Sequence, residues 1–298
     1  MRNDIKKMAE ALIHTRVDIS EVNTILVYNE GIKNAVEQVF KANEVAPPRI
    51  LYSLTNYKFF YTKFFIPNQE RVTLVTGPVT LLNKYRELVG NVKNLRSNNK
   101  GSYHYAKVSD LVNAIDKDFT VLPALKPVTG LLQDYEPHKD TVDGHTKEVV
   151  SEIKNTAYYM GASDDLKSVL VLAAYLHDIG KGPNNKWKLG KMTGAYPDHP
   201  ADTIPMLRRI LLEEIESLSG DEIRRICMLV VYHDIVGDCI TKERDKQQIA
   251  DLIETKDDLE MLFAMSLADA NAISSEWGKD IADCEKEFLH EIMEMKQS

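Results

Sequence analysis

Apolar residues recur at helical spacing through most of the second half of the chain. One stripe runs over residues 149–160, a second over 169–176, and a third over 277–295 at steps of three and four residues. This spacing puts the apolar side chains of each segment on one face of a helix, or buries the whole helix where the run is continuous. The pattern predicts an all-helical domain over residues 131–298, entered through the segment 133–143.

The first part of the chain has a different pattern of residue types. Residues 1–45 have helical spacing, whereas residues 49–76 are rich in β-branched and aromatic residues, with Asn and Pro-Asn breaks between them. The second segment predicts two or three antiparallel strands. A helix is expected near 80–88, and the polar, Asn-rich segment 92–103 predicts a loop. We therefore expect a small α+β domain over residues 1–130.

Composition and charge narrow the function classes. The 298 residues are 44% hydrophobic and carry a net charge of −8, from 37 basic and 45 acidic residues. An acidic chain without a basic stripe is a poor nucleic-acid binder, so no DNA partner is expected. The apolar run 169–176 is far shorter than the roughly 20 residues of a membrane span. Three dispersed cysteines and an N-terminus without a signal-peptide core suit a reducing cytoplasm.

Candidate chemistry gathers at the predicted helix ends. Histidines lie at or near the ends of four helices, with aspartates close by, and histidine and carboxylate are ligands that divalent metals prefer. The histidines are His145, His177, His199 and His233.

The pair His177–Asp178 is the most informative of these positions. It follows the apolar run VLVLAAYL and precedes Gly180. Adjacent helical residues point about 100° apart, so both can reach one ion only where the helix unwinds, and the following GKG supplies that unwinding. A carboxylate placed after eight apolar residues would be costly to bury without a compensating partner, and a metal ion is such a partner.

Asp269 is also in apolar surroundings, within AMSLADANAI. Taken singly, a histidine at a helix end is usually a cap or faces solvent, and Asp269 alone could cap a helix or join an ion pair. The order, spacing and environment of the residues together favour metal binding by His145, His177, Asp178 and Asp269.

The string VDGHT…LAAYLHDIGKG…DHP…VVYHD…SLADANA resembles the HD superfamily of metal-dependent phosphohydrolases over about residues 133–276. PHKDTVDGHTKEVV and SLADANAISSEW are most similar to the HD domains of uridylyl-removing enzymes and bacterial CCA-adding enzymes. The Gly-Ser and paired-Asp motif of their nucleotidyltransferase domain is not found in this sequence. Function is therefore not carried over from either enzyme.

The resemblance implies a ligand set. His145, His177, Asp178 and Asp269 match the ligands of a first metal, and His199 and His233 match the extra histidines of members with a second metal, with Asp178 bridging. YHDIVGD replaces the GYP signature of the cyclic-di-GMP hydrolases, and the stringent-response hydrolases lack the second histidine pair. Cyclic-di-GMP and the substrate of the stringent-response hydrolases are thereby disfavoured.

The implied mechanism is attack of a metal-activated water on a phosphoryl group. Lys181 would pair with a phosphate oxygen, with a solvated lysine as the alternative. His138 and Arg208 are weaker candidates for substrate binding, and Asp202 is a candidate to orient the His199 ring. Asp234, beside His233, is left open.

The sequence thus predicts a cytoplasmic, metal-dependent phosphohydrolase or phosphodiesterase acting on a small, nucleotide-like substrate with two divalent ions. Manganese, iron, cobalt, magnesium and zinc are not distinguished. The alternative is a non-catalytic signalling regulator that binds metal or nucleotide. RNA processing is a third option, disfavoured by the net charge.

The N-terminal segment 57–79 resembles PAS-like sensory domains. An ordinary aromatic-rich sheet packed on its helices explains the same residues. In either case this part is expected to regulate, position or dimerise the helical part, and a homodimer is compatible with the sequence.

Overall fold

The computed structural model describes residues 22, 24–27, 30–43, 45–52, 78–98, 103–182 and 186–297. The chain divides into two compact units, Met1–Glu70 and Arg71–Ser298, which are described separately.

The first unit contains a strand-helix-strand motif made of β1 (Thr24–Val27), α2 (Glu30–Ala42) and β2 (Arg49–Tyr52). The two strands pair in parallel, from Thr24 opposite Arg49 to Val27 opposite Tyr52. Parallel neighbours need a crossover connection, and α2 provides it. The helix expected at 31–42 is confirmed as α2, whereas strand β1 was not expected and the antiparallel pairing expected from Arg49 is wrong. Most of the PAS-like segment lies outside the described residues.

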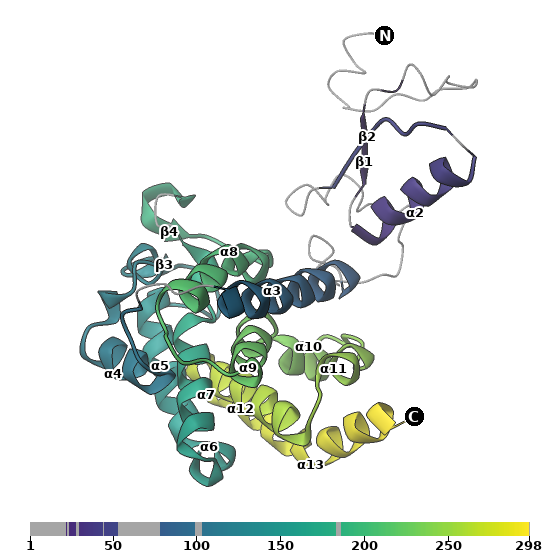
Figure 1. Cartoon of the computed structure of the whole chain (residues 1–298). Coiled ribbons are helices and arrows are strands. Elements are labelled where there is room, and N and C mark those ends of the chain that lie inside the picture. Colours follow the sequence, from purple (N-terminus) through teal and green to yellow (C-terminus); the bar gives the residue numbers. More distant parts are fainter. Residues whose placement is uncertain are drawn as a thin grey trace. The chain divides into compact units, whose positions relative to one another are not determined.

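The second unit is helical almost throughout, as expected (Figure 1). Two short parallel strands, β3 (Leu132–Gln133) and β4 (Lys191–Met192), join the segment before α5 to the segment before α8. The helices are α3 (Pro78–Asn98), α4 (Val108–Lys117), α5 (Val142–Asn155), α6 (Ala157–Gly161), α7 (Asp164–Leu176), α8 (His199–Glu213), α9 (Gly220–Val231), α10 (Ile235–Thr241), α11 (Gln247–Leu252), α12 (Lys256–Ile273) and α13 (Ser275–Gln297), with short 3₁₀ turns at Phe119–Val121, Lys126–Val128, Ile179–Lys181 and Lys188–Gly190.

Helices α3 and α4 belong to this unit, although the sequence placed them before a boundary at residue 130. Helix α3 packs on α8 and α9, and α4 packs on α7. The loop expected over 92–103 is also wrong through Asn98, because α3 continues to that residue, with Lys93 and Asn94 exposed on its outer side. Val92 is fully buried, and the Arg96 guanidinium donates to the carbonyl oxygens of Leu211 at 2.6 Å and Ile215 at 2.8 Å.

Helix α7 is the central element that positions the site. Every residue of its last two turns, 169–176, is buried, and α4, α5 and α9 pack around it. A helix that is apolar on all sides has to lie inside the fold. Its end therefore delivers His177 and Asp178 to the interior. In the described part of the chain, no helix has the length and apolar composition of a membrane span.

Candidate metal centre

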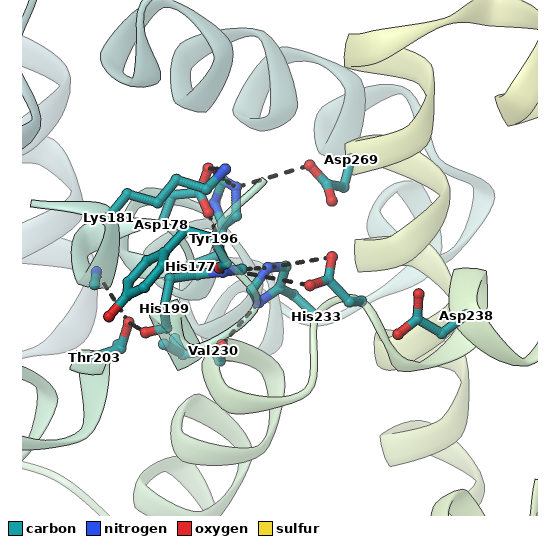
Figure 2. A network of polar contacts seen from close by, with 12 residues as sticks. His177, Asp178, Lys181, Tyr196, His199, Thr203, Val230, His233, Asp238 and Asp269 are labelled. Carbon is teal, nitrogen blue, oxygen red and sulfur yellow. Dashed lines mark hydrogen bonds and ion pairs between the residues drawn. The ribbon is translucent and has the colours of Figure 1, made fainter. Parts of the chain in front are cut away.

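Six side chains from five separate segments converge at the end of α7. His145 comes from the first turn of α5. His199 begins α8, and Asp269 projects toward the centre from α12 (Figure 2). We call the following six residues the His/Asp centre: His145, His177, Asp178, His199, His233 and Asp269.

One half of the centre is built around Asp269. Its Oδ1 lies 2.8 Å from the Nε2 of His145 and 3.8 Å from the Nε2 of His177. These three ligand atoms lie within 4.8 Å of one another, which is close enough to surround one cation.

The other half is built around Asp178. Its Oδ1 lies 3.4 Å from the Nε2 of His199, which in turn lies 3.0 Å from the Nε2 of His233. The other carboxylate oxygen of Asp178, Oδ2, lies 3.3 Å from the Nε2 of His177. Asp178 therefore faces both halves, one oxygen toward each.

Three of the four imidazole rings are oriented by the backbone. The Nδ1 atoms of His177, His199 and His233 lie 2.7, 2.6 and 2.9 Å from carbonyl oxygens three residues earlier in the chain. A carbonyl only accepts, so each Nδ1 carries the proton and donates it. In the neutral ring, Nε2 then presents a lone pair to the centre, which is the form that binds a metal.

The polar atoms of the centre fit a cation. Within the described residues, the buried Nε2 of His177 and Oδ1 of Asp178 have no hydrogen-bond partner. The Nε2 atoms of His199 and His233 face each other as two acceptors in the neutral rings. Buried polar atoms are rarely left unpaired, since each costs about 1–3 kcal/mol. Imidazole nitrogens and carboxylate oxygens form the mixed donor set that divalent transition metals take.

The electrostatics keep the carboxylates ionised. Burial alone would raise the pKa of Asp178, but the protonated form of His177 and the Lys181 ammonium hold it well below its usual range. Burial also opposes ionisation of Asp269, yet its hydrogen bond with His145 lowers the pKa of that carboxyl. For His199, burial is the main cause of a pKa lowered to about 4, which keeps the ring neutral.

Lys181 is buried and bonded to the centre. Its Nζ donates to Oδ2 of Asp178 at 2.6 Å and to Oε1 of Gln133 at 3.0 Å. Its backbone carbonyl accepts from the indole of Trp187 at 2.7 Å. The solvated-lysine alternative is therefore wrong. Gln133 was missed by the sequence analysis, and no local signal could have found it, since its role depends on β3 packing beside the turn that carries Lys181.

Two further candidates lie at the edge of the centre. The His138 ring stands edge-on to His145, with ring centroids 5.9 Å apart, and burial lowers the pKa of His138 to about 4. Asp234 places Oδ1 3.4 Å from the Nε2 of His233. Asp234 also forms a possible ligand group with His233 and Asp269.

The structure does not bring Asp202 or Arg208 to the centre. The Asp202 carboxylate bonds the Tyr196 hydroxyl at 2.5 Å and Lys186 at 2.7 Å, while the His199 ring is held by the Tyr196 carbonyl instead. Arg208 is exposed on α8, nine residues after His199. Nine residues correspond to two and a half turns, which places Arg208 on the opposite side of the helix.

Two further histidines of the described residues lie away from the centre. His104 pairs with Glu214, and His290 lies 3.3 Å from Glu294 on the exposed part of α13. His14 is outside the described residues.

Residues 142–270 match the family model of the HD domain. This segment is an HD domain. The match contains all six residues of the His/Asp centre and confirms the resemblance seen in the sequence. HD domains belong to a superfamily of metal-dependent phosphohydrolases that bind divalent metals, and the candidate ligand groups lie within this HD domain.

A curated relative is the bifunctional uridylyltransferase/uridylyl-removing enzyme of Hydrogenovibrio crunogenus. It is 27% identical over 177 residues, which cover 53% of this chain and 18% of the relative. The matching part of the chain therefore covers less than a fifth of that protein's length. No solved structure gives a significant match.

Proposed function

We propose that this protein hydrolyses the phosphoester bond of a small, nucleotide-like compound, using two divalent metal ions in the His/Asp centre. The observation that carries the proposal is the position of Asp178, whose two oxygens face two separate groups of ligands. His145, His177 and Asp269 would hold one ion, and His199 and His233 the other, with Asp178 between them.

The bound ions would lower the pKa of an attacking water and neutralise charge on the phosphoryl oxygens. Groups of the chain itself orient the ligands and supply a positive charge for this reaction. The backbone carbonyls hold three rings with Nε2 toward the centre. Lys181 keeps its proton, because Asp178 raises the pKa of this amine more than burial lowers it. A buried ammonium beside the ligands supports a role in pairing with a phosphate oxygen as charge builds.

The proposed setting is the cytoplasm, where the free thiols of Cys227, Cys239 and Cys284 stay reduced. A non-catalytic regulator that binds metal or nucleotide is the rival function. The complete set of candidate ligands supports the enzyme. The burial of Lys181 against Asp178 supports it too, because a protein that only binds metal has no need of an ammonium group beside its ligands.

The test combines metal analysis with turnover. Protein purified without chelator is examined by mass spectrometry for bound metals, then assayed with Mn²⁺ on bis-p-nitrophenyl phosphate, nucleotides and cyclic dinucleotides. Asp178→Ala should lose both metal and turnover, whereas Asp280→Ala, an exposed control on α13, should lose neither. Turnover retained in Asp178→Ala would overturn the proposal. Metal without turnover on any phosphoester would favour the regulator.

A further inference from the structure

A cavity of about 390 Å³ lies beside His145. We call it the His145 cavity. It is formed by the segment that precedes α5, by the first turns of α5 itself and by the end of α12. Its volume lies in the range of cavities that bind small molecules. His145 is the residue of the His/Asp centre that lines this cavity, so the cavity adjoins the centre at the His145 ring.

The floor of the cavity contains an amide with an unused donor. Gln133 is fully buried and lines the cavity. Its Oε1 accepts from the Lys181 ammonium, and because an ammonium can only donate, the amide orientation is fixed. Its Nε2 has no hydrogen-bond partner among the described residues. A buried N–H group of this kind calls for an acceptor atom.

The rim of the cavity carries an excess of negative charge. Asp140 and Glu148 both line it, and within the described residues no lysine or arginine pairs with either carboxylate. The one lysine of the lining, Lys139, is already paired with Glu136 at 2.9 Å. Carboxylates repel phosphate, so the rim disfavours a second phosphoryl group.

The remaining walls suit a ring. Pro137, Ala272 and Ile273 supply apolar surface, and the His138 imidazole adds a flat face. Most of the other lining residues are polar or charged, so the cavity offers this apolar surface together with several hydrogen-bonding groups, which suits a ring that carries polar substituents.

We propose that the His145 cavity holds a nucleoside whose single phosphoryl group lies at the His/Asp centre. Gln133 donates a hydrogen bond to an oxygen or ring nitrogen of the nucleoside, and Glu148 accepts from its hydroxyl groups. This inference rests on the proposed function and names its substrate class: esters of one phosphoryl group on a nucleoside, not nucleoside triphosphates. Gln133 and His138 precede the segment that matches the HD model, so this specificity belongs to the chain's own entry segment.

The activity test compares three esters of primary alcohols with Mn²⁺ present: a nucleoside 5′-monophosphate, the matching 5′-triphosphate and ethyl phosphate. The monophosphate should exceed both others in kcat/KM by about tenfold or more, since a site built to bond polar groups rejects a ligand that lacks or repels them. Glu148→Lys should lower the ratio of kcat/KM for the monophosphate to kcat/KM for the triphosphate about fivefold. Glu152→Lys makes the same charge change one turn further along α5, outside the cavity lining, and should leave the preference unchanged. A triphosphate hydrolysed as well as the monophosphate would overturn the inference.

A binding test separates this inference from the proposed function. Adenosine, guanosine, cytidine and uridine, which contain no phosphoester, are titrated into the full chain by NMR. At least one should bind, and Gln133→Met and Glu148→Lys should each weaken it about fivefold, as expected for the loss of one hydrogen bond. Binding without turnover of any phosphoester would uphold the cavity assignment and refute the hydrolase. Turnover with no nucleoside bound at about 10 mM, a range far weaker than ordinary recognition, would refute the cavity assignment alone.

Discussion

The Nε2 atoms of His199 and His233 lie 3.0 Å apart, while both rings use Nδ1 to bond a backbone carbonyl. Two neutral rings in this arrangement direct lone pairs at each other. The pair is therefore stable only when positive charge lies between or beside the two nitrogens. The negative charge of Asp178, 3.4 Å from His199, also favours a cation at this place.

Removing one ring of this pair should empty one half of the centre. We expect His233→Ala to lose about half of the bound metal and to keep the ion held by His145, His177 and Asp269, because loss of even an outer partner of a ligand weakens metal affinity about 10- to 100-fold. Elemental analysis of the purified variant gives the answer. His104→Ala, whose ring pairs with Glu214 instead, is the control. An unchanged metal content in His233→Ala would contradict a two-ion centre.

Lys181→Met should destabilise the metal-free protein more than the metal-loaded protein. Breaking a buried ion pair costs about 3–5 kcal/mol because the remaining charge has no partner, and a bound cation would give Asp178 another one. Urea unfolding with and without chelator measures the difference. Lys191→Met removes an exposed pair with Asp134 and should cost at most about 1 kcal/mol. Equal destabilisation by Lys181→Met in both conditions would argue against metal at Asp178.

Gly180→Ala should disrupt the contact between the turn after α7 and the start of α8. A Cβ at this position would lie 1.9 Å from the carbonyl oxygen of His199 and 2.5 Å from Oγ1 of Thr203. Backbone cannot yield as a flexible side chain does, so we expect a loss of about 3 kcal/mol or more, measured by urea unfolding, together with weaker metal binding. Gly161→Ala, with open space around the new methyl group, should be neutral or stabilising by up to about 1 kcal/mol. Similar unfolding curves for the two variants would show that the close approach at Gly180 does not matter.

Acid should weaken the link between α9 and α12. Burial opposes ionisation of Asp258, but hydrogen bonds from Arg224, Arg225 and the Glu254 amide lower the pKa of Asp258 to about 2. Its pKa in the unfolded chain is about 3.9. This contribution to stability is therefore complete above about pH 4 and disappears as the pH falls through about 2, a loss of about 2–3 kcal/mol.

The variant Asp258→Asn isolates that effect from the other carboxylates. It should be about 3–5 kcal/mol less stable than the wild type at pH 7, and urea unfolding should show the gap narrowing between pH 4 and pH 2. Asp257→Asn changes an exposed neighbour and should run parallel to the wild type. A gap that stays constant with pH would rule out the ionised Asp258 as its source.

The residues of the centre that could be predicted are those whose position follows from their neighbours in the sequence. His177 and Asp178 follow a continuous apolar run and precede a glycine, so helix end, burial and chemistry could be derived together. His199 begins α8, in agreement with its expected place at a helix end. The HD resemblance supplied the correspondence between these distant segments, which periodicity alone cannot provide.

The rest depended on contacts between segments that local pattern does not encode. The outer face of α3 is polar enough to suggest a loop, and only its packing on α8 and α9 makes it a helix through Asn98. Asp202 has the right spacing to reach the His199 ring, yet Tyr196 intervenes with both its carbonyl and its hydroxyl. Gln133 gains its role only through the bond from Lys181, 48 residues away.

The rings of His177, His199 and His233 are each anchored to a carbonyl three residues earlier in their own segment. Because that anchor is local, each imidazole takes its working orientation as soon as its helix end or turn forms, before any ion arrives. The entropy of ordering these ligands is thus lost during folding and not during loading. Metal binding by these three rings is therefore expected to need little rearrangement of the helix ends that carry them.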